Sequence, residues 1–408
     1  MNQSFNRQQL MKLCKQAEFV DYGLTLAQLG DNLDETVESI NKDEFTFEIA
    51  KVNEYYLTHD LPNKLVLRKL NDNLKRLYKD EQANRRIIIS QVKTLLEETC
   101  PFWVIKTDIK SFYESIDRDR VIEKFKNDSM LSFQSMYLLR KVFENPKISA
   151  TKGVPRGMNI SSTLSEIYMR KFDRWIRRFP SVYYYGRFVD DIIIFTNSLQ
   201  SSLDLVNVLN PKLKELAEGL EINNNKTELF NGSSLKSLNI STGSLLRKSN
   251  DLEYLGYRFT KEKRGKNEFL KVSIADKKIK KIKTRIVLAF LDFIKNKDFR
   301  LLENRIKFLT GNYSIRKNID GNDLRAGIYY NYLQVSDLTI FYELNSFYKK
   351  TLFSRNQSFG NKLSLALTGV QKERLNKYCF EKGFKFKVYN SFKFEEMSSI
   401  ISCWNGKS

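Results

Sequence analysis

Two adjacent aspartates, Asp190 and Asp191, lie between apolar arms, Phe188-Val189 and Ile192-Ile193-Ile194. Such arms predict a β-hairpin that carries the carboxylates at its tip. A simple β-turn would explain the pair, because aspartate favours turns. Two carboxylates between buried strands are costly, however, unless a divalent cation neutralises them. The pair therefore indicates either a turn or part of a metal site.

A third carboxylate, Asp108, falls near the end of a strand predicted over residues 102–110. It is either a strand-end aspartate, a helix cap, or the partner of Asp190 and Asp191. Three such carboxylates can hold two Mg²⁺ ions about 3.5–4 Å apart, with Mn²⁺ as the alternative metal. This arrangement activates a hydroxyl and stabilises a leaving pyrophosphate. Because Mg²⁺ prefers oxygen ligands, no histidine or cysteine is needed.

The composition narrows the chemistry further. The one histidine, His59, excludes zinc sites built from several histidines. The four cysteines, Cys14, Cys100, Cys379 and Cys403, show neither zinc-site spacing nor a disulfide framework. We therefore expect a reducing compartment, the cytoplasm.

The charge balance points to the partner. The 408 residues include 69 Lys and Arg against 48 Asp and Glu, for a net charge of +21. A solvated surface would explain part of this excess, but a polyanion such as nucleic acid is the stronger interpretation. No apolar run is long enough to span a membrane, so no membrane partner is expected.

The elements that must position these residues follow from apolar periodicity and turn residues. Residues 1–60 are predicted to be mostly helical. Leu65-Val66-Leu67 and Leu77-Tyr78, around Asn71-Asp72-Asn73, predict two strands joined by a turn. Helices are expected over 83–98, over 119–145 with a break near Pro146, after the loop 152–157, and near 200–219. In the helix after that loop, Thr163 and Glu166 have capping-box spacing.

The C-terminal third is basic. A helix from Asp276 carries Lys277, Lys281 and Arg285, while Ile279, Ile282, Ile286 and Phe290 form its apolar side. Beyond it, residues 304–313 and 326–332 combine aromatic and basic residues. They would form either a base-stacking surface or part of a helical core.

Five segments resemble, in order, the palm motifs of reverse transcriptases. They are Lys106–Tyr113 for the first motif, Gly153–Gly157 with Ser161-Ser162 for the second, Phe188–Asp191 for the aspartate pair, Leu220–Thr227 for the fourth, and Leu252–Tyr257 for the primer grip. Each segment alone is a weak signal, but their order and spacing together are specific. The resemblance covers about residues 100–260, with elements similar to fingers upstream.

The resemblance implies roles for single residues. Asp108, Asp190 and the Ile109 carbonyl would bind metal, with Asp191 contributing, and Lys226 would protonate pyrophosphate. Tyr113 would crowd a ribose 2′-hydroxyl, unless it is a core aromatic. The further residues implied are Arg76 and Arg86 as triphosphate clamps, in competition with Lys75 and Arg85, Leu255 and Gly256 as the primer grip, and Lys277, Lys281 and Arg285 as nucleic-acid contacts.

Two positions depart from the family pattern. Arg156 stands where the family usually has a glutamine that touches the sugar of the incoming nucleotide. We therefore expect nucleotide selection at this point to differ. Phe188-Val189 replaces the frequent Tyr-Ala and is a milder change.

The resemblance implies an α+β right-hand polymerase fold: fingers, a palm with a small antiparallel sheet, and a helical thumb followed by a helical C-terminal extension. The expected division is N-terminal helices and fingers over 1–100, palm over 101–262, and basic thumb and extension over 263–408. The implied enzyme is an RNA-directed DNA polymerase, a nucleotidyltransferase that uses an RNA template and deoxynucleoside triphosphates to make DNA.

The short run from Asp108 to Asp117 and the long basic C-terminal part look similar to bacterial antiphage-defence reverse transcriptases, including the abortive-infection branch. That similarity implies a dedicated noncoding RNA as template, and either a second reverse transcriptase or self-association. The alternatives are template-independent or protein-primed DNA synthesis on the same fold, and a catalytically silent RNA-binding protein.

Overall fold

The computed structural model describes residues 2–79, 83–239, 250–264, 267–317, 323–355 and 357–405. The chain divides into two compact units. The first comprises residues 1–88, 100–232 and 237–246, and the second comprises 89–99, 233–236 and 247–408. No described helix is both long enough and apolar enough to cross a bilayer. The division into fingers, palm and thumb at residues 100 and 262 follows roles in polymerisation and stays a prediction.

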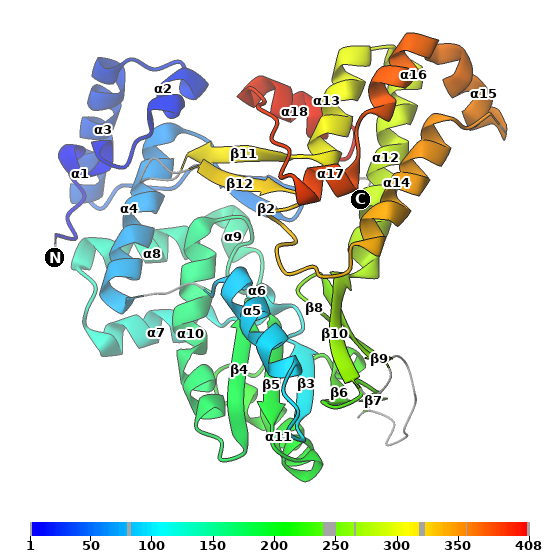
Figure 1. The fold of residues 1–408 in the computed structure, drawn as a ribbon. Helices are drawn as coiled ribbons and strands as arrows, with labels where there is room; N and C mark the ends of the chain where they lie inside the picture. The colour runs from blue at the N-terminus through cyan, green and yellow to red at the C-terminus, as the bar shows by residue number, and fades with distance from the viewer. Residues whose placement is uncertain are drawn as a thin grey trace. The chain divides into compact units, whose positions relative to one another are not determined.

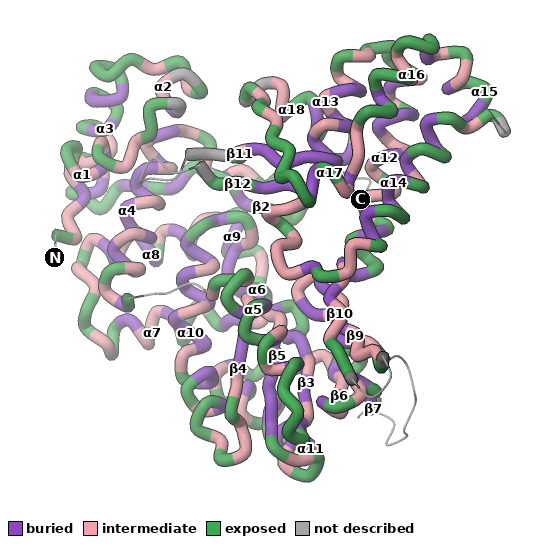
Figure 2. The backbone as a smooth tube through the Cα atoms, in the orientation of Figure 1, coloured by how far each residue is buried: buried purple, intermediate pink, exposed green. Residues whose placement is uncertain are grey.

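The first unit is built on a five-stranded antiparallel sheet with strand order β4-β5-β3-β6-β7 (Figure 1). Its strands are β3 (Trp103–Asp108), β4 (Val182–Phe188), β5 (Asp191–Thr196), β6 (Glu228–Asn231) and β7 (Ser237–Asn239). Ile192 to Phe195 in β5 are all 0 % exposed, and because successive side chains alternate between faces, both faces of this strand are covered (Figure 2). The predicted hairpin and the small antiparallel palm sheet are confirmed.

Helices supply the rest of the first unit. They are α1 (Arg7–Met11), α2 (Gln16–Tyr22), α3 (Leu26–Asn41), α4 (Leu61–Tyr78), α6 (Phe112–Ser115), α7 (Arg118–Asp128), α8 (Phe133–Glu144), α9 (Pro146–Ser149), α10 (Asn159–Arg177) and α11 (Leu199–Lys214), with the 3₁₀ turn η1 (Asn224–Lys226). A hairpin of β1 (Ile49–Val52) and β2 (Tyr55–Thr58) interrupts the N-terminal helices. The predicted helix over 119–145 is therefore two helices, and Pro146 begins a third.

The prediction of two strands around residues 71–73 is wrong, because this segment lies inside α4. Leu61, Leu65, Leu70 and Leu74 are at most 1 % exposed. At 3.6 residues per turn, Leu70 and Leu74 lie on the opposite side of the helix from Leu61 and Leu65, so α4 is buried on both sides. The Asp60 side chain caps the helix by accepting a hydrogen bond from the Asn63 N–H at 2.7 Å. Asparagines that suggested a turn are instead buried.

The capping box predicted at Thr163 and Glu166 is also wrong. Helix α10 begins earlier, at Asn159, so both residues lie within it. Thr163 is fully buried, and Glu166 pairs with Arg187 from the sheet. Thr163 and Glu166 have the spacing of a capping box, but one side chain is packed in the core and the other binds an arginine from the sheet.

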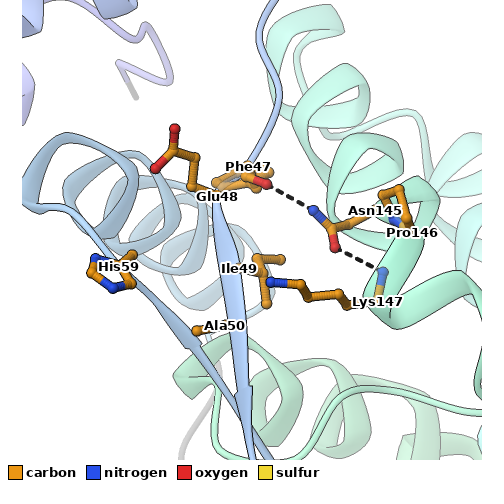
Figure 3. Close-up of a pocket in the computed structure, with 8 residues that line it drawn as sticks. All are labelled: Phe47, Glu48, Ile49, Ala50, His59, Asn145, Pro146 and Lys147. Atoms are coloured by element: carbon orange, nitrogen blue, oxygen red, sulfur yellow. Dashed lines mark hydrogen bonds between the residues drawn. The ribbon is translucent and has the colours of Figure 1, made fainter.

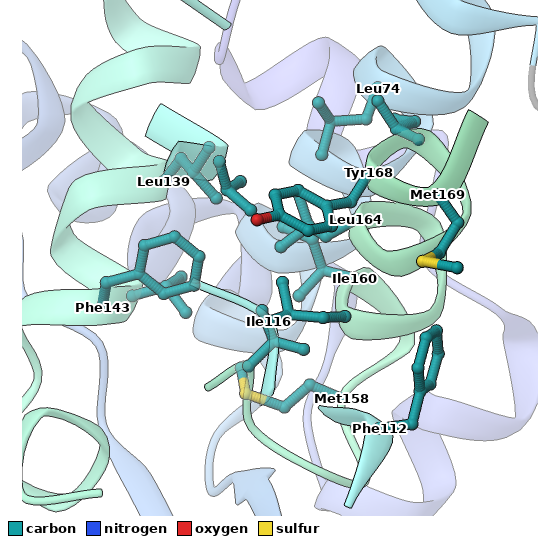
Figure 4. Close-up of a cluster of buried hydrophobic side chains, with 14 of the residues drawn as sticks. Leu74, Phe112, Ile116, Leu139, Phe143, Met158, Ile160, Leu164, Tyr168 and Met169 are labelled. Carbon is teal, nitrogen blue, oxygen red and sulfur yellow. The ribbon is translucent and has the colours of Figure 1, made fainter. Parts of the chain in front are cut away.

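The core of the first unit joins helices α4, α6, α8 and α10 (Figure 4). Leu74, Leu139, Leu164 and Met169 are at most 1 % exposed. Tyr168 lies among them and donates its hydroxyl hydrogen to the Leu216 carbonyl at 2.6 Å. This packing fixes α10 beside the sheet, and α10 carries two carboxylates that hold the aspartate hairpin in place.

The second unit contains two further antiparallel sheets and the C-terminal helices. One sheet has the order β10-β9-β8, from β8 (Asp251–Tyr254), β9 (Tyr257–Arg264) and β10 (Asn267–Ile274), and the other pairs β11 (Asn312–Lys317) with β12 (Asp323–Gly327). The helices are α12 (Asp276–Asn296), α13 (Phe299–Thr310), α14 (Thr339–Leu352), α15 (Gln357–Ala366), α16 (Gly369–Asn376), α17 (Phe380–Lys385) and α18 (Phe394–Ser402). The predicted basic helix from Asp276 is confirmed, whereas the β11–β12 hairpin was not predicted. Helix α5 (Arg85–Leu96), which agrees with the predicted helix over 83–98, spans the division between the units.

Candidate active site

Strand register brings the first and third aspartates together. In the antiparallel pair β3–β5, Asp108 lies directly opposite Asp191. Asp190 occupies the turn before β5, where its carbonyl accepts a hydrogen bond from the Ile109 N–H at 3.1 Å. Two segments that are more than eighty residues apart in the sequence therefore meet at one edge of the sheet. The three carboxylates predicted to act together are neighbours.

The hairpin turn adopts an unusual backbone conformation. Val189 has φ 61°, in the left-handed region that β-branched residues rarely occupy. The Arg187 side chain stabilises this turn, because its Nη1 donates to the Val189 carbonyl at 2.9 Å. Strained backbone persists only where the surrounding structure determines it, and such positions concentrate at functional sites.

Arg187 is the charged group beneath the hairpin that sequence reasoning missed. Its guanidinium is 3 % exposed and pairs with Glu166 at 2.7 Å and with Asp173 at 2.8 Å. The Tyr185 hydroxyl also donates to Asp173, at 2.6 Å. Burial lowers the pKa of Arg187, but the hydrogen bond and charge of Asp173, together with the charge of Glu166, raise this pKa well above its ordinary value. An arginine within an apolar strand, one residue before the motif, was the available signal.

The pKa values of Asp190 and Asp191 are shifted in the direction that disfavours their charge. Burial, together with the negative charges of Asp190 and Asp108, raises the pKa of Asp191 to about 6. Burial and the charge of Asp108 also raise the pKa of Asp190. Both shifts mean that negative charge at this edge is disfavoured until a cation arrives.

Lys226 is the cation that contacts this group directly. It closes the turn η1, and its Nζ donates to Asp108 Oδ2 at 2.7 Å. The backbone supports this contact, because the Asn223 N–H donates to the Asp108 carbonyl at 2.7 Å. The bond to Asp108 raises the pKa of Lys226, so the ammonium stays protonated at neutral pH. A protonated lysine at this point can donate a proton to a leaving phosphate oxygen.

The donor set fits a divalent metal ion. Asp108 Oδ1 is buried and has no hydrogen-bond partner in the structure. Adjacent carboxylates supply hard oxygen ligands, and the Lys226 ammonium occupies the Asp108 oxygen that a cation would otherwise neutralise. Within the part of the chain that the structure describes, however, no three acidic, histidine or cysteine side chains converge to metal-binding distance. The residues are in place, but their side chains do not form a closed coordination shell.

The loop at Gly153–Gly157 packs against the residues that follow Asp108. Gly153 has φ +72°, and a Cβ there would lie 2.1 Å from the Tyr113 carbonyl oxygen, so only glycine fits. The Val154 N–H donates to the same carbonyl at 2.8 Å. Tyr113 is thereby fixed beside the aspartates, and after burial the charge of Asp190 is the next largest cause of its raised pKa.

Arg156, the departure from the family pattern, is paired. Its Nε and Nη2 donate to the two carboxylate oxygens of Glu114 at 2.5 and 2.9 Å. The guanidinium also lies 5.9 Å from the centre of the Tyr113 ring. Glu114 is a second residue that sequence reasoning missed, since nothing in its local pattern indicated the partner. It offsets the charge that Arg156 brings to this loop.

The β1–β2 hairpin lies against this loop. The Tyr56 N–H donates to the Arg156 carbonyl at 2.8 Å, and Gly157 meets the Tyr55 side chain. A shallow pocket of about 340 Å³ opens between β1 and α9, with Lys147 and the only histidine, His59, on opposite sides of β1 (Figure 3). The histidine thus lines this pocket and is not one of the groups at the carboxylate edge.

The contacts of Arg76 and Arg86 do not identify a role for these two residues. Arg76 pairs with Asp72 on its own helix at 3.1 Å, and Arg86 is exposed in the first turn of α5. Neither makes a contact that identifies it as a triphosphate clamp, and those roles stay predictions.

The predicted primer grip and thumb residues belong to the second unit. Leu255 and Gly256 form the tight turn between β8 and β9, with φ 45° and 83°. On α12, Lys277 is exposed, and burial, together with the charges of nearby cations, lowers the pKa of Lys281. Arg285 lies 5.2 Å from the centre of the Trp404 ring. Lys277 and Lys281 therefore contribute positive charge along α12, whereas Arg285 also has a packing role.

The family comparison agrees with this geometry. Residues 60–259 match the family model described as reverse transcriptase (RNA-dependent DNA polymerase). These residues are similar to a reverse transcriptase domain. The family's activity is RNA-directed DNA polymerisation, which agrees with the predicted enzyme class, a nucleotidyltransferase, and the α+β right-hand fold is confirmed. Reverse transcriptases use divalent metal ions, RNA templates and deoxynucleoside triphosphates.

Solved telomerase structures are also similar to the chain, at low identity. Telomerase from Candida albicans with a TWJ fragment of telomeric RNA is 11 % identical, with TM-score 0.37, over 89 % of this chain and 63 % of that one. Apo telomerase from Candida Tropicalis is 11 % identical, with TM-score 0.36, over 95 % and 59 %. The chain therefore spans less than two thirds of these telomerases. No curated protein matches the chain.

Proposed function

We propose that this protein synthesises DNA on an RNA template, with Asp108, Asp190 and Asp191 as its metal-binding carboxylates. The observation that supports this proposal best is the register of β3 and β5, which sets Asp108 opposite Asp191, with Asp190 in the adjoining turn. Raised pKa values at Asp190 and Asp191 fit a site that a cation completes. The Ile109 carbonyl is the proposed backbone ligand.

A bound pair of divalent ions, Mg²⁺ or Mn²⁺, would supply charge stabilisation for phosphoryl transfer. The chain's own groups have separate tasks. Lys226 donates a proton to the departing pyrophosphate, while Tyr113 limits space at the ribose. The ion pair of Arg156 and Glu114 replaces the usual glutamine contact, so nucleotide choice depends on whether Glu114 keeps Arg156 engaged.

The finer biological proposal is bacterial antiphage defence in the cytoplasm, with a dedicated noncoding RNA as template. It is supported by the sequence resemblance of the segment 108–117 and of the basic C-terminal part. The net charge of +21 supports a polyanionic partner. A second reverse transcriptase or another copy of this chain would complete such a system.

Synthesis by the purified protein tests the enzymatic proposal. Purified protein receives Mg²⁺, each labelled deoxynucleotide, and an RNA template with an annealed primer, before and after nuclease treatment of co-purifying RNA. Template-dependent incorporation that Asp190→Asn abolishes is the expected result. Absence of incorporation in both proteins would overturn the polymerase function and favour a silent RNA-binding protein.

Two other outcomes would redirect the proposal. Incorporation that persists without any template would indicate template-independent synthesis. A product that remains attached to protein after denaturation would indicate protein priming. Sequencing of the co-purifying RNA and of the DNA product tests the noncoding-RNA template.

A further inference from the structure

The segment from Lys382 in α17 to Lys393 alternates cations with aromatic rings. It lies in the second unit, outside the residues that match the reverse transcriptase family. Its cations and rings are Lys382, Phe384, Lys385, Phe386, Lys387, Tyr389, Phe392 and Lys393. We call residues 385–390 the Lys/aromatic loop.

Asn312 at the start of β11 holds this loop. Its N–H donates to the Val388 carbonyl at 2.8 Å, and its own carbonyl accepts from the Asn390 N–H at 2.7 Å. The side-chain Nδ2 donates again to the Val388 carbonyl, at 3.1 Å, and to the Gly383 carbonyl at 3.0 Å. Because Asn312 is 0 % exposed, these bonds are shielded from water and fix the loop backbone.

A glycine makes this close approach possible. A Cβ at Gly383 would lie 1.7 Å from the Thr310 carbonyl oxygen. Helix α17 can therefore lie against the end of α13 only if this position has no side chain. The loop that follows α17 is carried on a packed scaffold.

The scaffold presents rings and cations to solvent. Phe386 is 74 % exposed and Tyr389 is 47 % exposed. The Tyr389 hydroxyl donates to Ser314 Oγ at 2.5 Å, so this ring lies along β11. Lys387 places its ammonium 4.8 Å from the centre of the Tyr329 ring.

The same surface continues onto the turn after β12. The Tyr329 N–H donates to Asn312 Oδ1 at 2.9 Å, which ties this turn to the same asparagine. Arg325, which is exposed, donates to the Tyr330 hydroxyl at 3.0 Å. One buried residue thus fixes two segments that both display aromatic rings and cations.

The chemistry of this surface selects its ligand. Lys382, Lys385, Lys387 and Arg325 carry four positive charges. One of them, Lys385, is paired with Glu381 in α17 at 2.6 Å, so a positive excess remains. Phosphates match the cations, and exposed ring faces match bases that are not paired in a duplex. An apolar protein segment would match the rings but would leave the flanking lysines without partners.

We propose that the Lys/aromatic loop and the adjoining turn bind single-stranded nucleic acid. Phe386 and Tyr389 stack on bases, and Lys387 and Arg325 contact phosphates. This binding goes beyond polymerisation and does not depend on it, because it requires none of the three aspartates.

Binding by the full chain tests the proposal. Fluorescent single strands of about 12 nucleotides, one of RNA and one of DNA, are titrated in parallel with a duplex of the same length. Loss of both stacking rings in Phe386→Ala/Tyr389→Ala should weaken single-strand binding about 10-fold or more. Lys387→Gln should weaken binding less and reduce its dependence on salt.

Matched variants separate the loop from general effects. Phe133→Ala removes a ring that is 77 % exposed in the first unit, and Lys297→Gln replaces an exposed lysine with φ 58°, close to the 52° of Lys387. Both should bind like the wild type. Phe386→Trp/Tyr389→Trp, which keeps ring faces, should bind within about 3-fold of the wild type, and this excludes misfolding as the cause of the alanine effect.

Further measurements decide what binds and where. Tighter binding of the RNA strand or of the DNA strand identifies which of the two is the ligand, and either supports the proposal. Photo-crosslinks to peptides that contain residues 385–390 are expected. The proposal is overturned if Phe386→Ala/Tyr389→Ala binds both strands like Phe133→Ala, or if crosslinks miss the loop. Primer extension with Asp190→Asn tests the polymerase function separately, since that variant should retain loop binding.

Discussion

Two groups of carboxylates lie near the β4–β5 hairpin, and they differ in how their negative charge is paired. Glu166 and Asp173 surround Arg187, and both bind its guanidinium within 2.8 Å. Among Asp108, Asp190 and Asp191, Asp108 binds Lys226 at 2.7 Å, while burial and mutual repulsion raise the pKa of Asp190 and Asp191. The first group binds a shared cation tightly, whereas in the second group negative charge is disfavoured.

The difference separates a structural ion network from a binding site. A buried network that is fully paired makes the turn rigid and holds Val189 in its strained conformation. A group of carboxylates that repel one another lowers stability unless a ligand compensates, so its presence favours a function. The ion network around Arg187 holds the hairpin turn that carries Asp190 and Asp191.

The largest effect should come from a substitution among Asp108, Asp190 and Asp191, and it should appear in the rate of DNA synthesis. Asp190→Asn removes a metal ligand and should lower DNA synthesis at least about 10³-fold. Stability without metal should not fall, because one repelling charge is lost. Primer extension and thermal unfolding measure the two quantities, with Asp204→Asn on α11 as the control. Synthesis within about 10-fold of the wild type would contradict the assignment.

A substitution in the ion network around Arg187 should lower the stability of the protein. Arg187→Met leaves the buried Asp173 and the part-buried Glu166 without their cation, so the free energy of unfolding should fall by about 3–5 kcal/mol. Arg76→Met, which breaks an exposed pair, should change it by less than about 1 kcal/mol. Denaturant unfolding compares the two variants. A loss below about 1 kcal/mol for Arg187→Met would show that the network is not needed for stability.

The pH dependence of stability is the next largest effect. The folded-state pKa of Asp191 is about 6, above its ordinary value of 3.8, so the folded protein binds this proton more tightly than the unfolded chain does. Stability of the metal-free protein should therefore fall by about 2 kcal/mol as the pH rises from about 4 to about 6. Asp191→Asn should remove this part of the pH dependence of stability. In the wild-type protein at pH 7, added Mg²⁺ should recover the stability that is lost. Identical pH profiles of unfolding for both proteins would contradict the repulsion.

The smallest effect is expected at Arg156. Its ion pair with Glu114 is more exposed than the network around Arg187. Arg156→Gln should change stability by less than about 1 kcal/mol. It should raise the KM for deoxynucleotides by less than about 10-fold, whereas Glu114→Gln frees the arginine and should lower this KM. Steady-state primer extension distinguishes the two directions. Equal shifts of the same sign would show that Arg156 does not contact the nucleotide.

Local patterns predicted the hairpin, strand β3 and the basic helix α12, because each combines a clear apolar period with polar ends. The segment around residues 65–78 was mistaken for strands because short apolar runs do not distinguish a strand from a helix. Asn73 looked like a turn residue, but it is buried and donates to the Gln3 carbonyl at 3.0 Å. Its partner is seventy residues away, and no local pattern contains that information.

The sequence by itself determined which residues are the candidates for the chemistry: two aspartates at the tip of an apolar hairpin, one at a strand end, and a large positive excess. Only the tertiary structure decided which charges are neutralised. Sheet register sets Asp108 opposite Asp191, α10 brings two carboxylates to Arg187, and Asn312 fixes the Lys/aromatic loop. These are contacts between distant segments, and they depend on packing that local propensity does not encode.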